Sequence, residues 1–243
     1  MAPCKHVSPI HPDAGGDTMI LYKDQQRPME QSELLGTLGR LEKERPDDLA
    51  RAKELFTNYV DPAIYYMPHP TVAQINALNC AFTEWCFFDF VLDPDPEGTP
   101  LAGGSVLEAA AERDDTLRRL ADTQFFSSFW VIEQDAEHDL SLLRETTTCQ
   151  DFIVHDHMMA HRRNWTQGVV NARIASIDGI WETCGKCLSH DKKESDPLPQ
   201  SLSSSTMPRH DRSRFIALTR DLQGVNGRYL ESVLAESFWP QQP

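Results

Sequence analysis

The first half of the chain carries apolar positions at helical spacing. Two successive sets, divided by Pro46, repeat every three or four residues and predict two short helices. A third set leads into an aromatic run at residues 79–92, which is too short to cross a membrane and too apolar to face water. A capping-box pattern at residues 105–108 predicts a further helix that reaches about Asp122. We therefore expect residues 29–123 to form a helical lobe around the aromatic run.

The second half of the chain changes to the pattern of β-strands. Residues 125–132 are rich in aromatic and β-branched side chains, and a polar turn separates them from a second apolar run at residues 140–143. Residues 168–177 predict another strand, and the Asp-Gly pair at 178–179 that follows is a strong signal for a two-residue hairpin turn. We therefore expect residues 124–187 to fold as a small antiparallel β-sheet or barrel.

The two ends of the chain differ in composition from its middle. Residues 1–28 are rich in Pro, Gly and Asp without a period, which predicts a mobile N-terminal arm. Residues 188–212 have the composition of a flexible linker, whereas residues 213–243 recover a helical period. The predicted fold class is α+β, with a helical N-terminal lobe, a small antiparallel β-sheet or barrel, and a C-terminal amphipathic helix on a flexible linker. The apolar stripe of that helix comprises Phe215, Leu218, Leu222, Tyr229, Leu230, Val233, Leu234 and Phe238.

Charge and cysteine content restrict the partners and the compartment. The 243 residues include 23 basic and 37 acidic side chains, giving a formal net charge of −14 at pH 7. Such a charge repels polyanions such as nucleic acid and anionic membranes. No segment reaches the ~20 apolar residues of a spanning helix, and the first residues lack the apolar stretch of a signal peptide. Six cysteines are too few for a disulfide scaffold at this length. We expect a cytoplasmic protein with reduced thiols and no membrane association.

The aromatic run also carries a family resemblance. It reads Phe82-x-Glu84-Trp85-x-x-Phe88-Asp89 and is followed by a polar turn, a capped helix and a Ser/Phe-rich β segment. Over roughly residues 70–182 this arrangement resembles an uncharacterised bacterial family, some members of which carry a C-terminal SEC-C zinc motif. The chain lacks the Cys-x-Cys and Cys-x-x-x-Cys pairs of that motif. The resemblance implies a fold, helices followed by a small β domain, more than a function.

A Cys-x-x-Cys pair and a group of upstream histidines suggest a metal site. Cys184 and Cys187 would present two thiolates to one tetrahedral ion. His155 and His157 would share a face if their segment is a strand, and His161 follows in the same stretch. Two thiolates and two imidazoles would complete a structural zinc site, so the cofactor is predicted to be either zinc or none. Two ordinary cysteines near the surface, or a redox pair, are the alternatives.

A small basic patch is the second candidate site. Arg162 and Arg163 stand beside Trp165, and cations next to an aromatic ring are typical of single-stranded nucleic-acid sites on small barrels. The alternative is an exposed turn whose Trp packs inward. The net charge of −14 opposes nucleic-acid binding, so the patch remains a secondary hypothesis.

No catalytic constellation is evident in the sequence. Glu84 and Asp89 are five residues apart, which on a helix separates their carboxylates by about 140° and places them on different faces. Neither a Gly-rich phosphate loop nor a Gly-x-Ser-x-Gly nucleophile elbow occurs. We therefore predict a non-enzymatic interaction or regulatory protein that binds a protein partner through its C-terminal helix. The alternatives are a single-stranded nucleic-acid-binding barrel and a zinc-dependent protein. The sequence indicates no oligomeric state.

Overall fold

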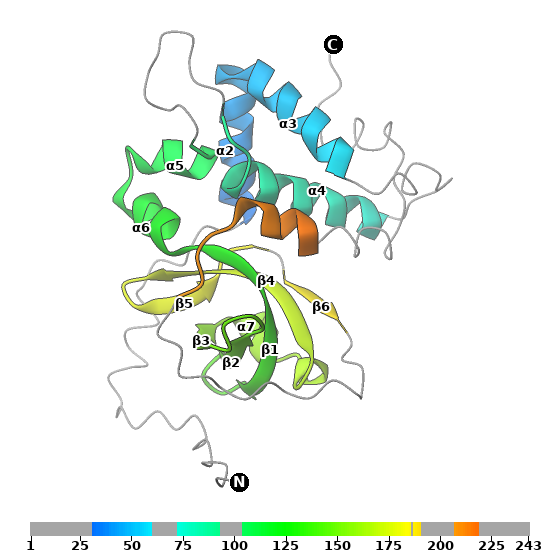
Figure 1. Ribbon diagram of the computed structural model, residues 1–243, viewed down its shortest axis with the longest axis vertical. Helices are drawn as coiled ribbons and strands as arrows, with labels where there is room; N and C mark the ends of the chain where they lie inside the picture. Colours follow the sequence, from blue (N-terminus) through cyan, green and yellow to red (C-terminus); the bar gives the residue numbers. More distant parts are fainter. Residues whose placement is uncertain (1–30, 60–71, 93–103, 186, 191–206, 219–243) are drawn as a thin grey trace, which may run out of the picture.

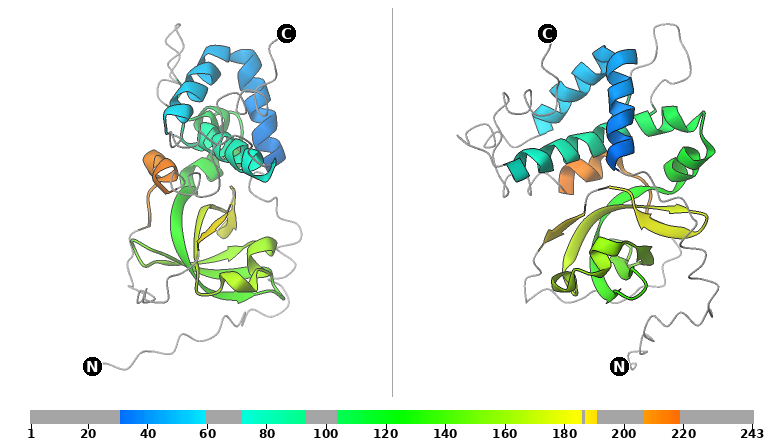
Figure 2. Two further views of the ribbon diagram at one scale, coloured as in Figure 1. Left: turned by 90° about the vertical axis from the view of Figure 1, so that its right-hand side faces the viewer. Right: turned by 180° about the vertical axis from the view of Figure 1, so that it is seen from behind.

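A computed structural model of the chain shows a helical lobe seated on one side of a β-barrel. Figure 1 places the helices of residues 31–123 above the barrel strands, and the side and rear views agree with this division (Figure 2). The predicted α+β fold, with a helical N-terminal lobe and a small barrel, is confirmed. The predicted N-terminal arm lies outside the described part of the chain. The structure describes residues 31–59, 72–92, 104–185, 187–190 and 207–218.

The helices come first along the chain and the strands follow, with two short helical segments between the third and fourth strands. The helices are α2 (Gln31–Glu44), α3 (Pro46–Tyr59), α4 (Val72–Phe88), α5 (Val106–Ala111), α6 (Asp115–Thr123), α7 (His157–Ala160) and the 3₁₀ turn η2 (Arg163–Trp165). The strands are β1 (Phe125–Asp135), β2 (Leu140–Glu145), β3 (Asp151–His155), β4 (Val169–Ile177), β5 (Ile180–Thr183) and β6 (Leu188–His190).

The aromatic run forms the centre of the helical lobe, as predicted. Every residue from 81 to 90 is buried, because the last turns of α4 are enclosed on all sides. The ring of Phe56 in α3 packs against Phe82 and Trp85 of α4, with centroids 5.2 and 5.5 Å apart. Aromatic pairs in this range contribute about 0.5–1.5 kcal/mol beyond the area they bury. Among the helices described, none is long and apolar enough to span a bilayer.

The capping box lies where the sequence predicts it, but the helix it opens is shorter than predicted. The Ser105 hydroxyl accepts a hydrogen bond from the Glu108 amide at 3.2 Å, and the Glu108 carboxylate accepts one from the Ser105 amide at 2.6 Å. Helix α5 nevertheless ends at Ala111, and α6 begins after Asp114. The Asp114 carboxylate accepts hydrogen bonds from the amides of the next turn and so caps a second helix. The expected single helix to Asp122 is therefore wrong.

The strands close into a five-stranded barrel. Its order is β1-β2-β3-β5-β4, and an additional pairing of β1 with β4 completes the ring. All of these pairs are antiparallel except β3 with β5, which are parallel, so the sheet is mixed and not wholly antiparallel. The parallel pair arises because the chain crosses one end of the barrel between β3 and β4, through α7 and η2. This Greek-key arrangement, with a helix between the third and fourth strands, is that of the OB-fold.

The predicted hairpin turn joins β4 to β5. Asp178 and Gly179 both have positive φ, 55° and 87°, as the tight turns that match strand twist require. The β1–β2 hairpin also lies where the sequence predicts it, although β1 continues to Asp135. Strand β6 pairs with the start of β4, so the first residues of the predicted linker, 188–190, extend the sheet.

The barrel and the helical lobe share one continuous core. Phe126 of β1 and Ala175 of β4 point out of the barrel and belong to the same buried cluster as Phe88 of α4. The C-terminal segment at 207–218, drawn in orange, lies between α4 and the barrel and is helical from residue 212 (Figure 1). Phe215 in this segment is buried in the shared core, so part of the predicted C-terminal helix docks on the body of the protein. The rest of that helix, from residue 219, lies outside the described residues.

Candidate functional site

The two cysteines of the predicted metal pair lie in different clusters. Cys184 is buried in the core shared by the two lobes, whereas Cys187 is partly buried and packs against the barrel interior. Burial raises the pKa of both thiols above the usual range. Both thiols are therefore protonated at neutral pH, and a metal ion would have to displace those protons. Cys86, Cys149, Cys184 and Cys187 are free thiols.

The histidines of the predicted site are divided by the local fold. The condition under which His155 and His157 would share a face, that both lie on one strand, is not met, because β3 ends at His155 and Asp156 caps the short helix α7. His155 Nδ1 lies 3.6 Å from the carboxylate of Glu182 on the neighbouring strand β5. His157 and His161 lie four residues apart at the two ends of α7 and are therefore neighbours on one face.

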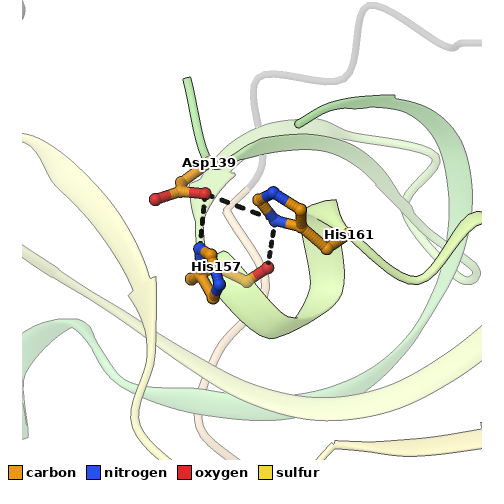
Figure 3. Close-up of side chains that lie close together, drawn as sticks. All are labelled: Asp139, His157 and His161. Carbon is orange, nitrogen blue, oxygen red and sulfur yellow. Dashed lines mark hydrogen bonds and ion pairs between the residues drawn. The ribbon is translucent and has the colours of Figure 1, made fainter. Parts of the chain in front are cut away.

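Asp139 joins His157 and His161 in a cluster that the sequence did not indicate. It lies in the β1–β2 turn, and Figure 3 shows its carboxylate beside both imidazoles. His157 Nδ1 is 2.8 Å from Asp139 Oδ1, and His161 Nδ1 is 3.5 Å from the same oxygen. The two rings are tilted by 41° relative to each other, with their centroids 4.2 Å apart. Among the residues that the structure describes, this is the one group of three His, Cys, Asp or Glu side chains close enough to share an ion.

The predicted basic patch lies at the same end of the barrel, between α7 and β4. Arg162 and Arg163 are exposed, and the Arg162 guanidinium carbon lies 5.6 Å from the centre of the Trp165 ring. Trp165 is partly buried and packs against the barrel core. The structure therefore brings the three residues together. The alternative that Trp165 packs inward also holds, because the ring contacts both the Arg162 guanidinium and the barrel core.

The sequence did not reveal a buried charge cluster at the junction of the two lobes. Arg173 of β4 is fully buried, and its Nε and Nη2 atoms lie 3.0 and 2.7 Å from the carboxylates of Glu84 and Asp89. Arg173 Nη1 also donates to the side-chain oxygen of Gln124 at 2.6 Å. The guanidinium lies over the ring of Phe88 at 4.4 Å. We call Arg173, Glu84, Asp89 and Gln124 the junction cluster; it joins α4 to the barrel.

Two neighbours complete the surroundings of the junction cluster. Gly185 lies against Glu84 so closely that a Cβ at this position would be 2.5 Å from the carboxylate, which explains why a glycine separates the cysteines. His210 of the C-terminal segment has Nε2 3.3 Å from Asp89 Oδ1. Burial raises the pKa of Asp89 to about 7, although Arg173 acts in the opposite direction. Burial, together with Arg173 and Arg212, lowers the pKa of His210 to about 4. His210 is therefore neutral at neutral pH.

The prediction that Glu84 and Asp89 face different sides was wrong for a geometric reason. Helix α4 ends at Phe88, and the amides of Asp89 and Phe90 both donate to the Trp85 carbonyl as the chain turns away. Asp89 is therefore outside the helix, where helical angles no longer apply. The available signal was an arginine in the middle of an apolar strand, since a buried cation requires buried carboxylates nearby.

Comparisons of the chain with protein-family models, with curated proteins and with solved structures found no match. The resemblance of the aromatic run to an uncharacterised bacterial family therefore stays a prediction.

Proposed function

We propose that the protein is a non-enzymatic cytoplasmic interaction or regulatory module whose C-terminal helix captures a protein partner. The observation that carries this proposal is the anchoring of the segment that leads into that helix. Phe215 is 1% exposed and packs edge-to-face on Phe126, with ring centroids 4.8 Å apart. Arg212 and Arg214 add ion pairs to Glu108 and Glu145 at 2.7 and 3.0 Å. The apolar stripe predicted beyond residue 218 thus starts from a fixed point on the body.

The chemistry of the described residues supports a binding role over a catalytic one. The junction cluster has the strongest concentration of charge, but Arg173 has no exposed surface, so a substrate cannot reach it. Cys184 is likewise buried, and its raised pKa makes it a poor nucleophile. An anchored amphipathic helix is a recurrent way of binding a groove on another protein.

The first test alters the stripe and leaves the anchor intact. A Leu230→Glu/Leu234→Glu variant places two charges on the apolar face, and Ser232→Glu/Ala235→Glu places the same charges on the opposite face of the predicted helix. We expect cross-linked partners purified from cells of the source organism to fall at least tenfold for the first variant only. Equal recovery by the two variants and the wild type would show that the stripe is not the binding surface.

A nucleic-acid-binding barrel is the second candidate function, and two observations favour it. The strand order is that of the OB-fold, many members of which bind oligonucleotides. In addition, Arg162 and Trp165 are in cation–π contact beside the exposed Arg163. Single-strand sites combine such cations with aromatic rings on which bases stack.

The second test measures the binding of fluorescent single-stranded oligonucleotides at several salt concentrations. If the patch binds, Arg162→Ala/Arg163→Ala should weaken the affinity and reduce the salt slope, which scales as about −0.7 per phosphate contact for single strands. Arg118→Ala/Arg119→Ala on α6 removes the same charge elsewhere and serves as the control. If the two double variants weakened binding equally, the affinity would depend on overall charge and not on the patch at Arg162 and Arg163.

A further inference from the structure

We propose that Asp139, His157 and His161 bind one divalent first-row transition-metal ion such as Zn²⁺. The site keeps two of the histidines that the sequence associates with zinc and replaces the two cysteines by a carboxylate. The site lies on the barrel and does not involve the C-terminal helix, so an experiment that refutes the metal site would leave the proposed function untouched.

The helix α7 presents both imidazoles from a fixed base. The face of α7 that is turned toward the barrel carries Met159, whose side chain is fully buried in the barrel core. The Met159 carbonyl also accepts a hydrogen bond from the Gln134 side chain. Asp156 caps the helix by accepting from the Met159 amide at 2.7 Å. His157 and His161 stand on the outer side, with 66% and 46% of their side chains exposed. Two histidines at this spacing can bind one ion from a single helical face.

The β1–β2 turn delivers the carboxylate to the same place. Asp139 has a left-handed backbone, with φ of 57°, and its carbonyl accepts a hydrogen bond from the Asp156 amide at 2.9 Å. The other end of the turn is fixed by Asp135, which accepts from the amides of Glu137 and His138. The carboxylate is therefore positioned by the backbone that links the turn to the start of α7, and its approach to the histidines is built into the fold.

The distances suit an ion of the size of zinc. Asp139 Oδ1 lies 2.8 Å from His157 Nδ1 and 3.5 Å from His161 Nδ1, and all three groups offer ligand atoms within 4.8 Å of one another. His161 Nδ1 also donates to the His157 carbonyl at 2.9 Å, and ligation through this atom would replace that hydrogen bond. Ligands held at about 2.0–2.2 Å from one zinc ion are roughly 3–3.5 Å apart. Small side-chain rotations would therefore place the three ligands around one ion, and the exposed side of the site leaves the remaining positions to water.

The donor set selects the class of metal. Two imidazoles with one carboxylate favour Zn²⁺ and its neighbours in the first transition row, whereas Mg²⁺ and Ca²⁺ prefer oxygen ligands alone. The ion would take the place of the proton that joins His157 Nδ1 to Asp139 Oδ1 in the metal-free hydrogen bond.

The test is calorimetric titration of tag-free full-length protein with ZnCl₂, together with the visible spectrum of the Co²⁺ form. We expect one ion per chain for the wild type and a Co²⁺ spectrum without the intense thiolate charge-transfer band. Asp139→Asn should weaken binding by at least tenfold, since losing even an outer-sphere partner of a metal ligand costs about 10–100-fold. His157→Asn/His161→Asn should remove binding. Asn tolerates the left-handed backbone of residue 139, so this variant retains the turn.

His138→Asn is the matched control, because His138 lies in the same turn but pairs with Asp135, at 2.8 Å. It should bind zinc as the wild type does. Wild-type protein without a heat of binding, unchanged affinity in His157→Asn/His161→Asn, or a cobalt–thiolate band would each overturn the proposal. The last result would return the ion to Cys184 and Cys187. Circular dichroism confirms folding, and Asp139→Asn decides the question if the double variant is misfolded.

Discussion

Replacing Arg173 by alanine is expected to lower the free energy of unfolding by about 3–5 kcal/mol, because it leaves two buried carboxyl groups without their cation. The side chains of Glu84 and Asp89 are 2% and 1% exposed, so water cannot take the place of the guanidinium. Urea unfolding followed by tryptophan fluorescence measures the loss, and Trp85 in the same helix reports on the junction.

Arg119→Ala is the control for this experiment. Arg119 also pairs with an aspartate, Asp178, at 2.9 Å, but the two side chains are 49% and 56% exposed. Its loss should therefore be about 0–1 kcal/mol. Replacing all three charges together, by Arg173→Met with Glu84→Gln and Asp89→Asn, should recover part of the stability. If Arg173→Ala cost no more than the control, the junction cluster would not be what joins the lobes.

The loss of unfolding free energy caused by Arg173→Ala should be smaller at acidic pH than above pH 7. The pKa of Asp89 is raised to about 7 in the folded protein, so its protonated form is favoured there, and the resulting stability is present at low pH and lost as the pH rises through about 7. Arg173 acts to lower this pKa, so its removal raises the pKa further. The difference in unfolding free energy between Arg173→Ala and the wild type should therefore be larger above pH 7 than at about pH 5.

The junction cluster also bears on what the sequence can and cannot reveal. Local signals predicted the helical lobe, the aromatic centre, the capping box and the Asp178-Gly179 hairpin, because each depends on neighbouring residues. Arg173 meets Glu84 and Asp89 across 84 to 89 residues of chain. Such a contact depends on how the barrel docks on α4, which no local pattern encodes. Two carboxylates of the resembled motif thus have a structural role that the sequence alone did not assign.

The geometry of the candidate metal site also depends on tertiary contacts that local sequence patterns do not encode. The histidine-rich stretch was visible, but its geometry depends on whether residue 156 continues a strand or caps a helix. An aspartate just before His157 is a helix-start signal, and it would have favoured the helical pairing of His157 with His161. Asp139 could not have been added from the sequence, because it reaches the histidines only through the pairing of β2 with β3, which places Leu140 opposite His155.

Truncating Phe215 to alanine is expected to cost about 3–5 kcal/mol, the usual loss for a buried phenylalanine. The ring is 1% exposed, packs on Phe126 and lies 5.5 Å from the Arg173 guanidinium carbon. Removing it leaves a cavity beside the junction cluster, where the surrounding aromatic rings can collapse only in part. Urea unfolding measures the loss, and hydrogen exchange should show residues 207–218 opening first, since Phe215 is the fully buried side chain among those that hold this segment to the core.

Ala217→Ser, on the exposed side of the same helical turn, should change stability by no more than about 0.5 kcal/mol. If Phe215→Ala also fell within that range, with unchanged exchange at residues 207–218, the segment would not be anchored by its ring. The fixed starting point of the C-terminal helix, on which the interaction proposal rests, would then be lost. A large loss with faster exchange in this segment would instead identify Phe215 as the residue that couples the tail to the body.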